Sequence, residues 1–184
     1  GFLNFFAGTA TRLNSKMGFA KYFDDYFQVD KSYDLSNPDI NWVIKKIQNF
    51  RGTDKFIFLH LDHLHDPLFA FNDKFKPNIY DLKNLDADYA NIHLEGYKIG
   101  LKKIDDQIGI LINYLKNNSE MENSLIIITG DHGNGINWIK GSDFSLYDER
   151  LRVPLIVKNA SWSKENNDNL DDAISSIFKI HQVL

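Results

Sequence analysis

Phe56-Ile57-Phe58-Leu59-His60-Leu61 is a short apolar run without polar alternation. A strand with this pattern is typically covered on both faces, as it is in a parallel sheet. Two further runs have the same character, one from Leu125 to Thr129 and one from Val153 to Val157 with a proline near its start. We therefore expect three buried strands, and these strands decide the fold class.

Helical patterns lie between these runs. Ser36-Asn37-Pro38-Asp39 indicates a helix start, and an apolar stripe of Ile40, Val43, Ile44 and Ile47 follows it. A second, longer stripe at spacings of three and four predicts a long helix with the apolar face Leu94, Tyr97, Leu101, Ile104, Ile108, Leu111 and Leu115. We expect a loop or lid from Asp73 to Asp88 and a last helix from Leu170 to His181.

Strands that alternate with helices predict an α/β fold with a mostly parallel sheet flanked by helices. The chain has 184 residues, 43% of them hydrophobic, so it is long enough to bury a substantial core. It contains no repeat and no long Gly/Ser-rich or Pro-rich linker. The simplest organisation is therefore a single domain over residues 1–184.

Composition excludes several classes of function. The net charge is −4, with 21 basic residues scattered among 25 acidic ones, so the chain offers no cationic face for nucleic acid. No apolar run approaches the roughly 20 residues that cross a bilayer, so we expect no membrane segment. Without cysteine there is no disulfide, thiolate metal site or cysteine nucleophile. The compartment and the oligomeric state are not indicated.

Two polar clusters follow predicted strands. Residues 60–67, His-Leu-Asp-His-Leu-His-Asp-Pro, carry three imidazoles and two carboxylates, and Gly130-Asp131-His132-Gly133 follows the run at 125–129. In an open parallel sheet, ligands bind beyond the carboxyl ends of the strands. If the strands are close in the sheet, the two clusters meet on one rim.

Carboxylates and neutral imidazoles are ordinary ligands of divalent ions, and glycines allow a turn in which two adjacent ligands point at one centre. A metal ion there would polarise a sulfuryl or phosphoryl oxygen, while a nearby Lys or His binds another oxygen or protonates the leaving group. Simpler interpretations exist. Taken singly, a residue such as Asp131 is more often a turn cap, His60 a hydrogen-bonded core residue and Lys140 a solvated loop lysine, and His63 is left out of the site.

The order of four segments resembles sulfatases of the alkaline phosphatase superfamily, specifically the middle and C-terminal part of their catalytic domain. A strand ends in His65-Asp66-Pro67, a helix covers residues 97–109, a strand leads into Asp131-His132-Gly133, and the segment 146–157 follows. The similarity extends from about Phe56 to Val157. Residues 18–24 are more loosely similar to an upstream family segment, and residues 170–180 resemble the helix after the last strand.

The resemblance implies roles for individual residues. Asp131 and His132 match the pair that binds the divalent ion, His132 standing where many sulfatases have Asn. His65 matches the histidine that contacts the ester, and Lys140 is the nearest candidate for the substrate lysine. Arg152 matches a residue with a structural role. The implied cofactor is a divalent metal ion, Ca or Mg, or Mn or Zn if the protein is phosphatase-like.

The sequence also departs from the family pattern. Asp62, His63 and Leu64 stand where sulfatases commonly have an aromatic residue, Asp and Pro, and the extra Asp and His are similar to two-metal phosphatases and phosphodiesterases. The family's first strand with its Asp ligands and its Cys/Ser-x-Pro-x-Arg nucleophile motif are not found between Gly1 and Lys55. We therefore expect a fragment of a larger enzyme, or a degenerate relative, that is inactive alone.

The leading functional hypothesis is a sulfuric ester hydrolase, in which the intact parent protein acts on a small-molecule or glycan sulfate ester. A metal-dependent phosphatase, phosphodiesterase or phosphotransferase of the same superfamily is the second hypothesis, because of Asp62 and His63. The third is a non-catalytic binding or structural module that has kept the sheet, because the nucleophile motif is missing.

Overall fold

The structure is a computed structural model, and it describes residues 2–9, 13, 15–29, 40–64, 87–133 and 148–158. The described residues form two compact units that divide within one long helix, between Tyr114 and Leu115. Each unit is described separately below. The expectation of a single domain stays a prediction.

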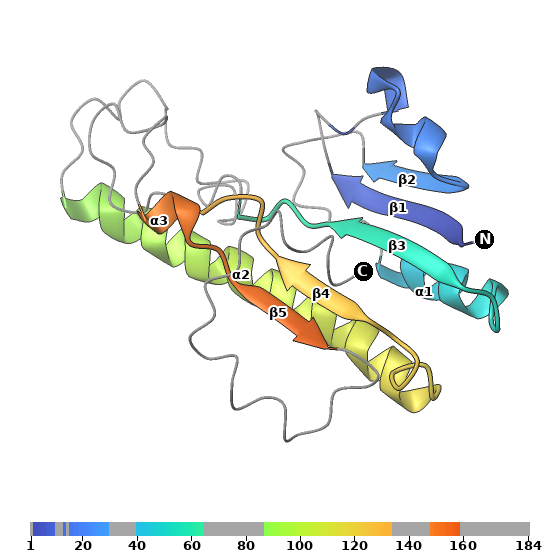
Figure 1. Cartoon of the computed structure of the whole chain (residues 1–184). Helices are drawn as coiled ribbons and strands as arrows, with labels where there is room; N and C mark the ends of the chain where they lie inside the picture. Colours follow the sequence, from blue (N-terminus) through green and yellow to red (C-terminus); the bar gives the residue numbers. More distant parts are fainter. Residues whose placement is uncertain are drawn as a thin grey trace. The chain divides into compact units, whose positions relative to one another are not determined.

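The first unit contains a three-stranded parallel sheet in the order β2-β1-β3 (Figure 1). Its strands are β1 (Leu3–Thr9), β2 (Asp25–Val29) and β3 (Lys55–His60). The strand expected at 56–61 and the parallel sheet are both confirmed. The sequence analysis did not identify β1 or β2, although β1 is the central strand.

Strand β1 forms the centre of the core because it has a neighbour on each side. Phe5, Phe6 and Ala7 expose 2%, 0% and 0% of their surface. The Phe6 ring stacks on Tyr26 of β2 at 4.3 Å and on Phe58 of β3 at 5.6 Å between ring centroids. These three aromatic residues are cross-strand partners on one face of the sheet, which ties the strands together.

Helix α1 (Ile40–Asn49) covers the opposite face of this sheet. Its Trp42 ring packs against Phe5 and Phe27, with centroids 6.5 and 5.4 Å away. Ile40, Val43 and Ile47 are buried, so the predicted apolar stripe is confirmed. The predicted helix start at 36–39 lies outside the described residues.

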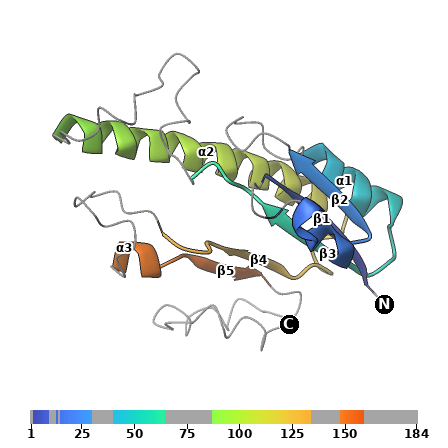
Figure 2. The same cartoon turned by 90° about the horizontal axis from the view of Figure 1, so that it is seen from above.

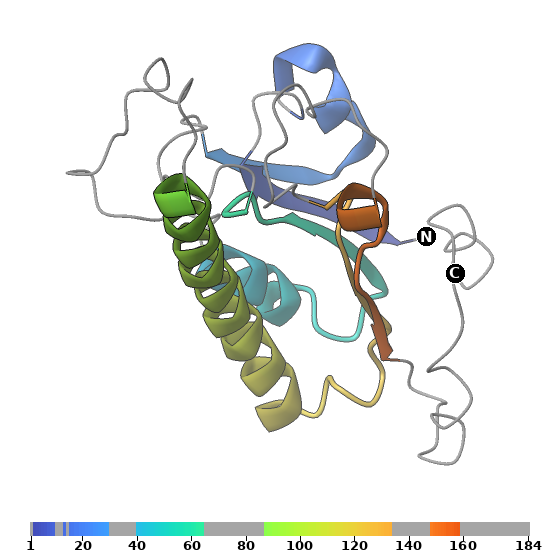
Figure 3. The same cartoon turned by 90° about the vertical axis from the view of Figure 1, so that its left-hand side faces the viewer.

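Two short 3₁₀ helices, η1 (Ser15–Met17) and η2 (Phe19–Tyr22), lie on the other side of the sheet from α1 (Figure 3). Phe19 and Phe23 pack against Phe6, with centroids 5.6 and 5.4 Å away. Gly18 precedes η2 with φ 78°, a left-handed conformation that glycine adopts without steric cost. The sheet therefore has apolar cover on both faces of its central strand.

Helix α2 (Ala87–Asn117) is 31 residues long and confirms the long helix expected from the sequence. Most residues of the predicted apolar face are buried or half-buried, but Leu101 is 49% exposed. At this turn of the helix the buried residue is its neighbour Gly100. The solvent-exposed face of the helix carries the ion pair of Lys102 with Asp106. None of the described helices is long and apolar enough to span a membrane. Except for its last two residues, the loop expected at 73–88 lies outside the described ranges.

One prediction about β3 is wrong. Its side chains alternate between half-buried and exposed, and Phe56 and Phe58 are 43% and 38% exposed, so the strand is not covered on both faces. An apolar run does not distinguish a strand with two covered faces from one whose aromatic residues line a partly open face, because hydrophobicity alone carries no information about neighbours. The other two strands expected to be buried are not buried either: residues 126–128 are half-buried and Leu125 is 40% exposed, while Leu155 and Ile156 are 39% and 57% exposed.

The second unit contains the antiparallel pair β4 (Ile126–Thr129) and β5 (Leu155–Lys158), which lie side by side in Figure 2. A four-residue helix, α3 (Asp148–Leu151), precedes β5. The strands expected at 125–129 and 153–157 are confirmed in position, whereas their antiparallel pairing was not foreseen. Lys158 at the end of β5 donates hydrogen bonds to the carbonyls of Met121 and Ser124, which fixes the turn before β4. The helix expected at 170–181 lies outside the described residues.

Candidate active site: the Asp131-His132 pair

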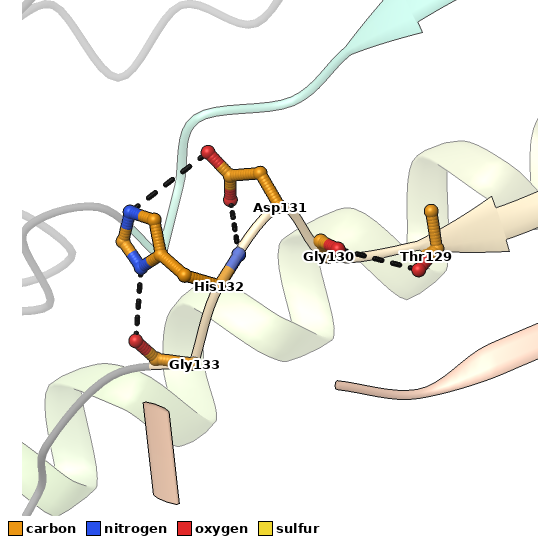
Figure 4. Close-up of polar contacts among 5 residues, drawn as sticks. All are labelled: Thr129, Gly130, Asp131, His132 and Gly133. Carbon is orange, nitrogen blue, oxygen red and sulfur yellow. Dashed lines mark hydrogen bonds and ion pairs between the residues drawn. The ribbon is translucent and has the colours of Figure 1, made fainter. Parts of the chain in front are cut away.

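Strand β4 ends at Thr129, and the turn Gly130-Asp131-His132-Gly133 begins there (Figure 4). Asp131 accepts a hydrogen bond through Oδ1 from the backbone N–H of His132, at 2.9 Å. This bond fixes the direction of the carboxylate and leaves its second oxygen, Oδ2, pointing away from the backbone. Gly130 does not have a left-handed backbone conformation, and a Cβ atom there would make only ordinary van der Waals contacts, at 3.4–3.5 Å. The turn therefore does not require glycine at position 130.

The imidazole of His132 is held in one orientation. Its Nδ1 lies 2.9 Å from the carbonyl oxygen of Gly133. A carbonyl only accepts hydrogen bonds, so Nδ1 carries the proton and, in the neutral ring, Nε2 carries a lone pair. Metal-bound histidines in proteins typically use this arrangement, with the non-ligating nitrogen bonded to a carbonyl or carboxylate.

The two free ligand atoms face each other. His132 Nε2 lies 3.8 Å from Asp131 Oδ2, which is too long for a hydrogen bond. Ligand atoms bind Zn²⁺ at about 2.0–2.2 Å, so two ligands about 4 Å apart can share one ion. Since two lone-pair atoms repel each other at this distance, a cation between them lowers the energy of the pair. The two residues therefore fit a divalent metal ion.

The pair is accessible, but two ligands would supply only part of the coordination of a metal ion. The side chains of Asp131 and His132 are 82% and 51% exposed, so an anionic ligand and solvent can both reach them. Within the part of the chain that the structure describes, no group of three or more His, Asp or Glu side chains is placed to hold a metal. Two ligands do not complete the four or more positions of a divalent ion. Further ligands must come from other residues or from the substrate and water.

The turn is anchored by α3. The backbone N–H of Gly133 donates to the carbonyl of Arg150 at 2.8 Å. Arg152 in turn bonds Asp148 twice, through its backbone N–H at 2.8 Å and through Nε to Oδ2 at 3.1 Å. These contacts agree with the structural role expected for Arg152. The sequence analysis missed the Gly133–Arg150 bond, because a backbone hydrogen bond between residues 17 positions apart leaves no signature in side-chain identity.

The remaining site residues are only partly described. His65 and Lys140 lie outside the described residues, so their proposed roles stay predictions. His60 is the last residue of β3 and is half-buried, and His63 is 6% exposed. Of the four site residues expected from the sequence, the structure brings together Asp131 and His132, which are neighbours along the chain.

Comparison with known proteins identifies the family. A profile of the family described as Sulfatase matches residues 2–184 of the chain. The chain belongs to the sulfatase family. The resemblance noted from the sequence is thereby confirmed, and it extends further toward both ends than residues 56–157. No curated protein matches this sulfatase-family chain.

A solved structure supports the fold of the sulfatase-family chain. The lipoteichoic acid synthase LtaP from Listeria monocytogenes is similar with a TM-score of 0.52 and 14% sequence identity. The match covers 88% of this chain and 44% of the LtaP chain, so the chain spans less than half of that relative. At this identity the likeness shows the fold, and the predicted α/β class with a parallel sheet is confirmed. Members of the sulfatase family generally use divalent metals.

Proposed function

We propose that the intact protein hydrolyses a sulfate ester in a divalent-metal-dependent reaction, and that Asp131 and His132 hold the ion. The observation that carries this proposal is the geometry of the pair. Asp131 Oδ2 and His132 Nε2 face each other at 3.8 Å, and both side chains are held in place by hydrogen bonds to the local backbone.

The chain's own residues supply binding and orientation. The Gly133 carbonyl keeps the lone pair of His132 on Nε2, and the bond from Gly133 N–H to Arg150 fixes the turn. When bound, the metal ion neutralises charge on the ester oxygens. His65 is proposed to contact the ester group and Lys140 to bind another of its oxygens, as in the family. The substrate class is a small-molecule or glycan sulfate ester.

Phosphoryl transfer or hydrolysis is the second candidate. An imidazole ligand favours Zn over Ca or Mg, which prefer oxygen ligands, and the pair here contains one. The similar solved structure is named as a lipoteichoic acid synthase. Both observations support this second candidate alongside the sulfatase proposal.

The metal role is tested by Asp131→Ala and His132→Ala in the intact protein. Each variant should lose bound metal, and its turnover should fall by on the order of 100-fold or more. Replacing a residue that only hydrogen-bonds to a metal ligand already lowers metal affinity or activity by about 10–100-fold. Asp105→Ala, an exposed carboxylate on α2, is the matched control and should keep both properties. Normal turnover in Asp131→Ala would refute the metal role.

The substrate class is tested with a panel of aryl sulfate, aryl phosphate and aryl phosphodiester, each with Ca, Mg, Mn and Zn. Preferred turnover of aryl sulfate supports the sulfatase proposal. Preferred turnover of either phosphate ester supports the second candidate. Absence of turnover of all three by the intact protein, together with metal binding at Asp131, would favour a binding module.

A further inference from the structure

Gly100 lies at a close approach between α2 and the segment that follows β3. A Cβ at Gly8 would also come within 3.0 Å of a neighbour, but the atoms there belong to side chains, the closest being Phe6. Gly100 is buried on α2, and a Cβ atom there would lie 2.8 Å from the His63 carbonyl oxygen and 3.1 Å from Leu64 Cδ2. Real Cβ atoms essentially never come within 3.0 Å of such a neighbour. The closest atom belongs to the backbone, so no side-chain rotation relieves the clash.

Glycine is required here by distance and not by backbone conformation. Gly100 is helical, whereas the glycines with positive φ in the described ranges are Gly18 and Gly52. Helix interiors normally disfavour glycine relative to alanine. Because residue 100 has no side chain, the helix backbone can pack directly on His63 and Leu64.

The segment that contacts Gly100 connects the sheet to His65 along the chain. Strand β3 ends at His60, the described chain continues to Leu64, and His65 is the next residue. His63 is 6% exposed and is the buried polar side chain of the described residues. A 31-residue helix is a rigid support, so a contact with it fixes the path of the residues that touch it.

We infer that Gly100 is a positioning residue: its contact with the His63 backbone and the Leu64 side chain sets the point from which the chain continues to His65. The inference rests on the proposed function, in which His65 contacts the ester. A methyl group at position 100 moves His63 and Leu64 by a few tenths of an ångström or more. Misplacement of a group that contacts the substrate by about 1 Å costs up to about 100-fold in rate.

The test compares Gly100→Ala with Gly109→Ala in the intact protein. Both glycines lie on α2, but a Cβ at Gly109 would have no atom within 4 Å. Gly100→Ala should lower kcat by about 10- to 100-fold and increase hydrogen exchange of the peptide covering residues 61–64. Gly109→Ala should change neither, and both variants should retain the metal at Asp131. Equal kcat and equal exchange in the two variants would overturn the inference.

A double-mutant cycle with His65→Ala separates positioning from general damage. If Gly100 acts through His65, Gly100→Ala has no further effect on kcat once His65 is alanine. A full further loss in that background would overturn the inference while leaving the role of His65 intact. Normal kcat in His65→Ala would overturn the role of His65 and, with it, the inference.

Leu64→Ala replaces Gly100→Ala in the cycle if the latter does not fold. It removes the second contact of Gly100 without adding bulk. It should lower kcat in the wild-type background by several-fold and have no effect in the His65→Ala background. A kcat equal to that of the wild-type protein would count against the inference.

Discussion

At the scale of single residues, the proposed metal ligands Asp131 and His132 depend on local geometry. Asp131 and His132 are adjacent, and the bonds that orient them run to the backbone of His132 and Gly133. Such contacts need no distant partner, so sequence reasoning could identify the pair from its residue types. The orientation of the ring, with Nε2 toward Asp131, is information that only the coordinates supply.

His132→Asn tests the contribution of the imidazole to metal choice. The substitution replaces a nitrogen ligand with an amide oxygen, so we expect the affinity for Zn to fall by about tenfold or more and that for Ca or Mg to change less. Isothermal titration with each metal measures this. Asp131→Asn is the control and should weaken all metals, since a carboxylate serves each of them. An unchanged preference for Zn in His132→Asn would contradict imidazole ligation.

The ion pair of Asp25 with Lys46 predicts a pH dependence of stability. The hydrogen bond from Lys46 lowers the pKa of the Asp25 carboxyl from its ordinary value of 3.8. The folded state therefore binds this proton less readily than the unfolded state. The stabilisation is present above about pH 3.8 and is lost as the pH falls through the lower, folded pKa. The Asp25 side chain is 44% exposed, so the contribution is small, about 0.5 kcal/mol.

Asp25→Asn should accordingly lower the free energy of unfolding near neutral pH and flatten its decline below pH 4. Urea unfolding at several pH values measures both effects. In a Lys46→Met background, Asp25→Asn should flatten the profile much less, because the group that lowers the pKa of Asp25 most is gone and only the backbone N–H of Tyr26 still lowers it. The same pH profile for Asp25→Asn and the wild-type protein would contradict the role of the pair.

At the scale of elements, long periodic helices were easier to predict than the strands. The apolar stripes of α1 and α2 recur over several turns, so their pattern identifies them independently of their neighbours. Strand β1 is only seven residues long, and its apolar residues Leu3 and Phe5 to Ala7 give no helical or alternating period. Its central place follows from pairing with β2 and β3, which local sequence does not encode.

Phe6→Ala tests the central position of β1. Phe6 has no exposed surface and contacts rings from β2, β3 and η2, so its removal should cost about 3–5 kcal/mol of unfolding free energy. Phe56→Ala is the matched control, because Phe56 is 43% exposed and should cost about 1 kcal/mol or less. Chemical denaturation of both variants measures the difference. Equal losses would contradict the burial pattern.

At the scale of the whole molecule, the chain combines a parallel three-stranded sheet with an antiparallel pair, in two units. Each unit carries one of the two polar clusters that the sequence placed after strands. The Asp131-His132 turn belongs to the second unit, and His60 to Leu64 to the first. Family membership rests on the whole of residues 2–184.

Metal binding should stabilise the folded protein. A ligand that binds only the folded state raises the free energy of unfolding by about 2.7 kcal/mol at 100 times its Kd. We expect the melting temperature of the intact protein to rise on addition of the preferred divalent ion and to fall again with a chelator. Asp131→Ala should abolish the shift. An equal shift in that variant would place the ion elsewhere.

The sequence by itself determined the α/β class, helices α1 and α2, the positions of β3, β4 and β5, and the family, because these depend on periodicity and on motifs contiguous along the chain. It also identified Asp131 and His132 as neighbouring ligand types. The tertiary structure decided the central place of β1, the antiparallel pairing of β4 with β5, the exposed face of β3 and the contact of Gly100 with His63. These features depend on which segments pack together, and packing between residues distant in sequence is set by the folded chain as a whole.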